Sequence, residues 1–531
     1  MASVLVQLNN VSFAYPGWKD YLLRNISFTI QSGDRIGLLG YNGSGKTTLL
    51  DVIAGIKEPT EGEVIKRCNN LFYLKQEDYA YGSLSIIEYL IQTEPKFYEL
   101  HQRMIQCENS NLTDSLEYAN IVYEFNKQGG YDFIKRIEKN AALFGFSAAD
   151  FSRKIDSLSG GEKRILKIIT GFIHNFDLYL LDEPTNYLDD RGIELLIRAI
   201  RFSSSAFLIV SHDRWFLDQM VGKVIEIEQK TAKIYNGNYS KFHRTKQIEI
   251  TTKLKKKEKI ETEIHHLKDI ARNYRIWGLR KEKEKVGAGD KGFISHRAAK
   301  LLKRVKISEE RIKKRISEFE KTKPYIEKYY DFWFEKTDIP RGSCLSVNLL
   351  SKKFGDKTLF QDFSFTVDWG EKITIAGPNG SGKTTLLKIV MGKESPDSGE
   401  VVWHNLSKIG YLPQVWDSPE DFITVDSLFS EEQKEIANHL IGTLKVMAMG
   451  NVFPKRLGEL SEGQKRKIKL VQLILNKPNI LILDEPTTHL DYQTVEFLEK
   501  ALIEYNGTVI LISHDRFLRD RVTTRRITVG S

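Results

Sequence analysis

The stretch Gly40–Thr47 has the sequence GYNGSGKT, follows the apolar segment 35–39 and precedes a segment rich in Leu and Ile. A glycine-rich loop that leaves a strand, ends in Lys-Thr and opens a helix is a P-loop, in which backbone N–H groups surround phosphates. The same pattern returns as GPNGSGKT at Gly377–Thr384. The sequence therefore predicts two α/β domains, each with a phosphate-binding loop.

Three further motifs also occur twice and in the same order. They are Leu-Ser-x-Gly-x at 158–162 and 460–464, Asp-Glu-Pro-Thr at 182–185 and 484–487, and Ser-His-Asp at 211–213 and 513–515. The offset between the copies is 338 residues at Gln76 and Gln414 but 302 residues at these motifs, so copy one contains 36 additional residues. We expect an enlarged helical subdomain at about 77–157, either as added helices or as a short protruding arm.

Composition places the chain among soluble proteins. Of its 531 residues, 28% are charged and 41% are apolar, and no apolar run approaches the roughly 18–20 residues of a membrane span. The first residues, MASVLVQ, lack the layout of a signal peptide. Cys68, Cys107 and Cys344 have no metal or redox spacing. We therefore expect a cytoplasmic protein with reduced thiols.

The net charge of +9 is concentrated between the two copies. Residues 244–339 contain 28 Lys or Arg and 16 Asp or Glu, a net charge of +12. Apolar residues at Ile260, Ile264, Leu267, Ala271 and Tyr274 follow the spacing of a coiled-coil seam, and a second stripe runs over 298–319. With a turn at 287–290, this predicts an antiparallel helical hairpin whose first helix, 244–285, is about 63 Å long. The expected domains are 1–243, the basic linker 244–339 with its tip at about 277–297, and 340–531.

Cations and aromatic residues gather near the predicted tip. Candidate RNA-binding residues are Arg272, Arg275, Trp277, Arg280, Lys281, Lys291, Phe293 and Arg297. Cations that neutralise phosphates, together with rings that stack on bases, are typical of RNA contact. A solvated spacer between the two domains is the simpler alternative, but it has no use for the two aromatic residues.

The repeated motifs predict ATP hydrolysis with Mg²⁺ as cofactor. Lys46 and Lys383 should reach the β- and γ-phosphates. The expected metal-binding side chains are Thr47, Thr384, Asp182 and Asp484. Glu183 and Glu485, at the ends of buried strands, would position and polarise the attacking water. Both sites contain every one of these residues, so we expect two active sites.

The Leu-Ser-Gly-Gly-Glu motif at 158–162 resembles the diagnostic motif of the ATP-binding-cassette superfamily. The resemblance implies two cassettes packed head to tail around two ATP molecules, with Lys46 opposite Ser461 and Gly463, and Lys383 opposite Ser159 and Gly161. It implies that Gln76 and Gln414 sense the γ-phosphate and metal, that His212 and His514 contact the γ-phosphate, and that Tyr15 and Phe354 stack on adenine. It also implies nucleotide contacts from Gly40, Asn42, Gly43, Ser44, Gly45, Thr48, Gly160, Gly377, Asn379, Gly380, Ser381, Gly382 and Thr385. Glu462 replaces the glycine found at Gly160, so the two sites could differ in rate.

Tandem cassettes joined by a basic hairpin resemble the ABC-F family of ribosome-associated ATPases. The match includes Tyr235–Ser240, typical of the entry to the family's linker, while Tyr187 departs from the usual His. The family implies a monomer whose ATP-bound form occupies the exit site of the bacterial 50S subunit and contacts 23S rRNA. Its linker would reach along P-site tRNA to the peptidyl-transferase centre. Residues 290–300 resemble Lsa- and Vga-type members, which confer resistance to lincosamides, pleuromutilins and streptogramin A. A housekeeping translation factor and, more remotely, a transporter ATPase subunit are the alternatives.

Overall fold

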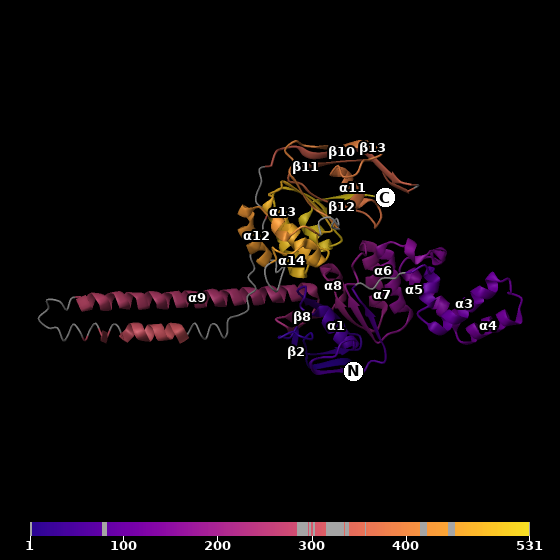
Figure 1. The fold of residues 1–531 in the computed structure, drawn as a ribbon, viewed down its shortest axis with the longest axis horizontal. Helices are drawn as coiled ribbons and strands as arrows, with labels where there is room; N and C mark the ends of the chain where they lie inside the picture. Colours follow the sequence, from indigo (N-terminus) through magenta and orange to yellow (C-terminus); the bar gives the residue numbers. More distant parts are fainter. Residues whose placement is uncertain are drawn as a thin grey trace. The chain divides into compact units, whose positions relative to one another are not determined.

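The computed structural model describes residues 3–76, 82–283, 296, 299–300, 303–314, 334, 339–355, 357–414, 422–443 and 452–529. The chain divides into two compact units. One contains Met1–Ser240 and Asp331–Ser531, which hold the two cassettes, and the other is Lys241–Tyr330 (Figure 1).

The first cassette is built on a six-stranded sheet with the order β5-β6-β7-β3-β8-β9, in which β9 pairs antiparallel and the other described strands pair parallel. The strands are β3 (Arg35–Gly40), β5 (Leu71–Leu74), β6 (Leu178–Asp182), β7 (Ala206–Val210), β8 (Lys223–Glu228) and β9 (Thr231–Asn236). Every residue of β6 and β7 is buried, as expected for parallel strands covered on both faces. An antiparallel sheet adds β1 (Val4–Phe13), β2 (Leu23–Gln31) and β4 (Glu61–Lys66).

The second cassette repeats this plan. Its parallel sheet has the order β14-β15-β16-β12-β17, and its antiparallel sheet has the order β11-β10-β13. The strands are β10 (Ser343–Phe354), β11 (Lys357–Asp368), β12 (Lys372–Ala376), β13 (Ser398–Trp403), β14 (Ile409–Leu412), β15 (Ile480–Asp484), β16 (Thr508–Ile512) and β17 (Arg525–Thr528). The α/β class and the two tandem cassettes expected from the sequence are confirmed.

Equivalent helices carry the motifs of both cassettes. They are α1 (Lys46–Ala54), α6 (Gly160–Ile173), α7 (Asp190–Phe202) and α8 (Arg214–Met220) in the first, and α11 (Lys383–Val390), α13 (Glu462–Leu475), α14 (Tyr492–Glu504) and α15 (Arg516–Val522) in the second. The central strands β6, β7 and β3 are neighbours and parallel. Since their carboxyl ends lie at one edge, the sheet brings the P-loop, the Asp-Glu pair and the Ser-His-Asp motif together.

The additional residues of copy one are helical. Helices α2 (Ile86–Ile91), α3 (Pro95–Asn109), α4 (Leu116–Lys127) and α5 (Gly130–Leu143) follow β5, whereas α12 (Glu431–Thr443) is the described helix at the equivalent place in copy two. The rings of Phe97, Phe125 and Phe133 form a small core, with Phe97 5.7 Å from Phe125 and 5.1 Å from Phe133 between ring centroids. In Figure 1, α3 and α4 form the outer end of this cassette.

The second unit contains a long helix and a shorter one. Helix α9 (Tyr239–Lys283) has 45 residues, equivalent to about 68 Å, and residues 303–314 are also helical. The two helices lie side by side, because Arg275 Nη2 is 3.2 Å from Glu309 Oε1 and the Arg304 guanidinium lies over the Tyr274 ring at 5.8 Å. The predicted turn at 287–290 and most of the second stripe lie outside the described residues. No described helix is both long enough and apolar enough to cross a bilayer.

Candidate nucleotide sites

Each P-loop leads directly into the N-terminus of a helix. Gly45 and Gly382, which precede α1 and α11, have φ angles of 94° and 95°. This left-handed backbone favours glycine, and a Cβ at Gly45 would lie 2.8 Å from the Leu23 side chain. Both positions therefore require glycine, and the first backbone N–H groups of each helix face the loop, where they can bind phosphate.

The two loop lysines fold back over their own loops. Lys46 Nζ donates hydrogen bonds to the carbonyls of Gly40 at 2.8 Å and Tyr41 at 2.9 Å. Lys383 makes the equivalent pair of contacts at 2.8 and 3.0 Å. Burial lowers the pKa of both lysines. A phosphate placed in the loop would favour the charged form of each lysine.

Buried oxygen atoms at the loops fit a magnesium nucleotide. Thr47 Oγ1 donates a 2.7 Å hydrogen bond to Asp182 Oδ2, and burial raises the pKa of Asp182 and raises that of Asp484 to about 6. Within the described chain, the buried hydroxyls of Ser44 and Ser381 and the Oδ2 of Asp484 have no hydrogen-bond partner. Hydroxyl and carboxylate oxygens suit Mg²⁺, which binds one or two carboxylates together with substrate phosphates. No described cluster of three or more His, Cys, Asp or Glu residues could hold a metal without such a substrate.

The glutamates expected to act on water are held in a strained conformation. Glu183 and Glu485 have φ angles of 49° and 47°, a left-handed region that non-glycine residues adopt infrequently. Glu183 Oε2 accepts a hydrogen bond from the backbone N–H of His212 at 3.2 Å, and Glu485 Oε2 accepts one from His514 at 3.1 Å. The imidazole Nε2 lies 3.3 Å from Glu183 Oε1 in the first pair and 3.4 Å from Glu485 Oε1 in the second.

Electrostatics makes Glu183 suitable as a base. Burial and the neighbouring Asp182 carboxylate raise the pKa of Glu183 to about 8. Burial and the Lys46 ammonium lower the pKa of His212 to about 3. A glutamate whose pKa is near the working pH can accept a proton from water, while a neutral His212 can donate a hydrogen bond to a phosphate.

Two buried arginines were missed by the sequence reasoning. Arg164 donates to the carbonyls of Lys75, Asp182 and Glu183 at 2.8, 2.8 and 3.0 Å. Arg466 makes the matching contacts in copy two, with the carbonyls of Glu485, Pro413 and Gln414. These arginines connect the signature helix to the strand ends that precede Gln76 and Gln414. Their recurrence at an offset of 302 residues was the available signal.

A cavity of about 830 Å³ joins the first P-loop to the second signature motif. The predicted residues that line it are Tyr15, Asn42, Gly43, Gly45, Lys46, Thr47, Thr48, Gln76, Asp182, Glu183 and His212 from the first cassette, with Ser461, Gly463, Glu485 and His514 from the second. Lys46 thus shares a cavity with Ser461 and Gly463. Ser461 also caps helix α13, where its hydroxyl accepts a hydrogen bond from the Gln464 backbone.

The second P-loop faces a smaller cavity of about 240 Å³. Gly377, Lys383 and His514 line it together with Asp189 and Asp190 of the first cassette. The described lining does not include Ser159, Gly161, Gln414 or Phe354. Gly161 nevertheless lies near this P-loop, because a Cβ on it would be 3.3 Å from Asn379 Nδ2.

The candidate adenine residues differ between the sites. The Tyr15 hydroxyl lies 3.1 Å from Thr48 Oγ1, and the Trp18 ring is 5.3 Å from the Tyr15 ring. Phe354 is 53% exposed, and Lys352 Nζ lies 5.2 Å above its ring. Only the first site therefore presents an aromatic pair, within the described part of the chain, beside its cavity.

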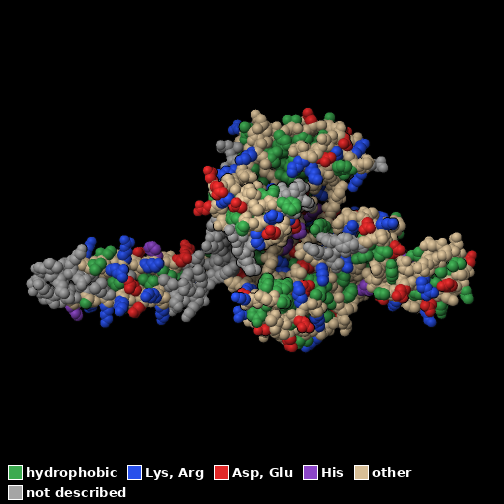
Figure 2. Space-filling view, in the orientation of Figure 1, with side chains coloured by type: hydrophobic (Ala, Val, Ile, Leu, Met, Phe, Trp, Pro, Cys, Tyr) green, Lys and Arg blue, Asp and Glu red, His purple; other side chains and the backbone are tan. Residues whose placement is uncertain are grey.

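The described part of the hairpin carries exposed cations. Arg272 and Arg280 are exposed, and Trp277 is 53% exposed, while Arg275 forms the ion pair with Glu309. Figure 2 shows Lys and Arg side chains spread along this unit, with acidic residues between them. Lys291, Phe293 and Arg297 lie outside the described residues, as does the side chain of Lys281.

Comparisons with known proteins agree with this architecture. A family model described as "ABC transporter" matches residues 23–186 and 360–488, and a second model with the same description matches 225–287. The ribosome protection protein VmlR of Bacillus subtilis is 31% identical over 99% of this chain and 87% of its own length. The energy-dependent translational throttle protein EttA of Escherichia coli is 29% identical over 99% of this chain and 92% of its own.

A solved structure shares the fold at low sequence identity. The archaeal ribosome recycling factor aABCE1, in complex with the stalk protein aP1, aligns with a TM-score of 0.58 over 98% of this chain and 87% of that chain, at 18% identity. At this identity the similarity shows only that the fold is that of tandem cassettes.

Proposed function

Because the chain belongs to the ABC-F family of ATP-binding-cassette ATPases, we propose that it acts on the bacterial ribosome and protects it from antibiotics. The observation that carries the proposal is the combination of two ATP sites with a hairpin segment of net charge +12. ATP would draw the cassettes together, and the closed protein would occupy the exit site of the 50S subunit. The hairpin would then extend along P-site tRNA and 23S rRNA towards the peptidyl-transferase centre.

The ATP chemistry follows from the residues around each P-loop. Mg²⁺ would be held by Thr47 and Asp182 in the first site and by Thr384 and Asp484 in the second, and it would offset charge on the phosphates. Glu183 and Glu485 would orient and deprotonate water. In the first site the pKa of about 8 for Glu183 supports this role, because a base must accept a proton near neutral pH. Hydrolysis would then separate the cassettes and permit release.

Antibiotic protection is favoured by the similarity to VmlR, whose name describes ribosome protection. We propose lincosamides, pleuromutilins and streptogramin A as the drugs displaced. A second candidate, a translation factor that positions P-site tRNA, is favoured by the similar coverage of the throttle protein EttA. A transporter subunit is disfavoured because it gives the +12 hairpin segment no role.

Two linked experiments test the proposal. The Glu183→Gln, Glu485→Gln double variant should bind ATP, lose at least 100-fold in turnover and co-sediment with ribosomes. Glu194→Gln, an exposed change on α7 outside both cavities, serves as the control that should keep turnover. Undiminished hydrolysis in the double variant would exclude the glutamates as bases.

Expression in a drug-susceptible bacterium separates the two candidate functions. Growth in the presence of a lincosamide, a pleuromutilin or a streptogramin A should improve with the intact chain and not with the double variant. Ribosome binding without drug protection would favour the tRNA-positioning role. Absence of ribosome binding by the double variant would overturn both.

A further inference from the structure

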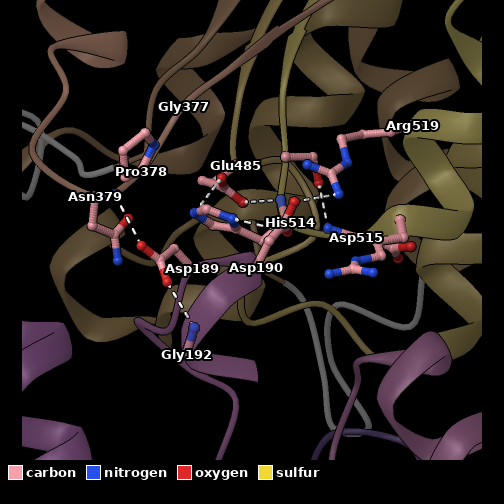
Figure 3. Close-up of polar contacts among 12 residues, drawn as sticks. Asp189, Asp190, Gly192, Gly377, Pro378, Asn379, Glu485, His514, Asp515 and Arg519 are labelled. Atoms are coloured by element: carbon pink, nitrogen blue, oxygen red, sulfur yellow. Dashed lines mark hydrogen bonds and ion pairs between the residues drawn. The ribbon is translucent and has the colours of Figure 1, made fainter. Parts of the chain in front are cut away.

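The two ATP sites differ in what faces the histidine. Asp190 is the first residue of α7 in the first cassette, and the equivalent residue of the second cassette, 302 positions later, is Tyr492. The Tyr492 hydroxyl donates a 2.9 Å hydrogen bond to Glu226 Oε1. Asp190 instead reaches the second site, where its Oδ1 lies 3.7 Å from His514 Nδ1 (Figure 3).

The backbone around Asp190 is held in place from both cassettes. Asp189 caps α7 by accepting a 2.9 Å hydrogen bond from the Gly192 N–H, and its other oxygen accepts one from the Asn379 N–H at 3.2 Å. Figure 3 shows Asp189 and Asp190 reaching from the first cassette to the second P-loop and to His514. Arg519 Nη2 donates a 2.8 Å hydrogen bond to Asp190 Oδ2. The free oxygen, Oδ1, is thereby directed at the imidazole.

Two buried atoms face each other at this contact. Within the described chain, Asp190 Oδ1 and His514 Nδ1 are both buried without a hydrogen-bond partner. Their separation of 3.7 Å is an ion-pair distance, and a shift of less than about 1 Å would convert it to a hydrogen bond. On its other side, His514 Nε2 lies 3.4 Å from Glu485 Oε1. The imidazole therefore lies between a carboxylate of its own cassette and one from the other cassette.

The surroundings of His212, the first-site histidine, lower its pKa, whereas those of His514 raise its pKa. Asp491, the equivalent of Asp189, is buried and paired with Lys467 at 2.6 Å, whereas copy one has Ile165 at the position of Lys467. Burial and the Lys46 charge lower the pKa of His212 to about 3. Burial acts against protonation of His514 too, but Glu485 and Asp190 outweigh it and raise the pKa of His514.

We propose that Asp190 is a positioning residue for the second ATP site, acting from the opposite cassette to hold the Nδ1 side of His514 so that Nε2 faces Glu485 and the γ-phosphate. Among the described residues, the counterpart of Asp190 at the first site is Tyr492, and it is hydrogen-bonded to Glu226 instead. Turnover at the second site therefore requires the N-terminal end of α7 to lie against His514 of the second cassette. The two sites are thus unequal in what their turnover requires. The inference rests on the assignment of His514 to an ATP site and not on any role at the ribosome.

Steady-state ATPase kinetics of the full chain in free solution test the proposal. Asp190→Asn removes the carboxylate charge and should lower kcat about 10-fold while KM changes less than twofold, the size of effect typical of residues that orient a catalytic group. Asp190→Glu should recover part of that loss.

A matched control separates positioning from general docking. Glu194 lies on the same helix and forms a 2.6 Å ion pair with Arg516 of α15 in the second cassette. Glu194→Gln removes a charged contact between the same two helices without touching the histidine, and should change kcat less than twofold. If Glu194→Gln reduces kcat as much as Asp190→Asn does, Asp190 only supports docking and the proposal is overturned.

Inactivating one site at a time locates the effect. In a Glu183→Gln background, turnover reports the second site, and in a Glu485→Gln background it reports the first. The fall in kcat caused by Asp190→Asn should be at least fivefold larger in the first background than in the second, and equal falls would overturn the proposal. If neither background hydrolyses ATP, the proposal is judged from the kcat and KM of Asp190→Asn in the otherwise intact chain. Since ribosomes are absent throughout, a negative result leaves the ribosomal function untouched.

Discussion

The side-chain amide of Asn42 donates a 2.9 Å hydrogen bond to the backbone carbonyl of His489. Asn42 belongs to the first P-loop, and His489 follows the Asp-Glu-Pro-Thr motif of the second cassette. The mirror contact joins Asn379 to the carbonyl of Tyr187 at 3.0 Å. A main-chain carbonyl is the acceptor in both, so His at 489 and Tyr at 187 can make the same interaction. The departure from the family at Tyr187 therefore leaves this contact intact.

The signature glycines are required by the same contact. A Cβ at Gly463 would lie 2.5 Å from the His489 carbonyl oxygen, and one at Gly161 would lie 2.7 Å from that of Tyr187. Gly463→Ala should displace the His489 loop, break its bond to Asn42 and lower ATPase turnover more than 10-fold. Gly222→Ala is the control, because Gly222 lies outside the motifs and a Cβ there meets no atom within 4 Å. Equal losses in Gly222→Ala and Gly463→Ala would show that the close approach is irrelevant.

A buried ion pair between the cassettes should dominate the stability of their contact. Arg214 of the first cassette is 2% exposed and lies 2.6 Å from Glu499 Oε2 and 3.1 Å from Asp515 Oδ2 of the second. Arg214→Met leaves the Asp515 carboxylate and Glu499 Oε2 without their shared partner, while Glu499 Oε1 keeps its 2.7 Å ion pair with Arg521. We therefore expect the free energy of unfolding to fall by about 3 kcal/mol, the lower end of the range for a broken buried pair. Chemical denaturation followed by circular dichroism measures it.

The control for Arg214 is a more exposed pair. Arg516→Met breaks the ion pair with Glu194, whose side chain is 47% exposed, and should cost about 1 kcal/mol or less. Adding Glu499→Gln to Arg214→Met should restore part of the stability. A loss for Arg214→Met no larger than that for Arg516→Met would mean that solvent screens the buried pair.

The pH dependence of stability should have a contribution from Asp213. Burial and the nearby Asp515 carboxylate raise the pKa of Asp213 to about 7, against about 3.9 in an unfolded chain. The folded state therefore holds a proton that the unfolded state releases, and this group lowers stability as the pH rises from about 4 to 7. Asp213→Asn mimics the protonated acid and cannot ionise.

Melting temperatures of wild type and Asp213→Asn at several pH values check this sign. The two should agree near pH 4, and the variant should melt a few degrees higher at pH 8. The Asn side chain can still accept the helix-capping bond from the Phe216 N–H, which Asp213 makes at 2.9 Å. Parallel curves from pH 4 to pH 8 would show that Asp213 is ionised in the folded protein.

The hairpin cations should govern the salt dependence of ribosome binding. Replacing Arg272, Arg275 and Arg280 by Gln should weaken binding and make the slope of log K against log salt less negative by about 0.7–0.9 for each phosphate that is no longer neutralised. ATPase activity in free solution should stay within twofold. Lys253, Lys255 and Lys256, changed to Gln near the start of α9, remove the same charge farther from the tip. An unaltered slope in the arginine variant would remove these residues from the RNA interface.

Sequence patterns predicted the features of this molecule that depend only on residues close together along the chain. The glycines of each P-loop, the continuous apolar strands β6 and β15, and the cations of α9 are all visible without a fold. The extra 36 residues were also located, although their division into α2–α5 was left open. The buried contacts of Arg164 were not anticipated, because the recurrence of this arginine as Arg466 indicates a repeated role but does not say which backbone carbonyls it reaches.

The sequence by itself determined that the chain has two cassettes with complete sets of ATP-site residues and a basic segment between them. Only the tertiary structure decided how the sites differ. Asp190 and Tyr492 occupy the same place in the repeat, but one faces His514 and the other Glu226. The physical reason is that these contacts form between residues more than 250 positions apart. Their geometry depends on how the cassettes pack, and spacing along the chain carries no information about it.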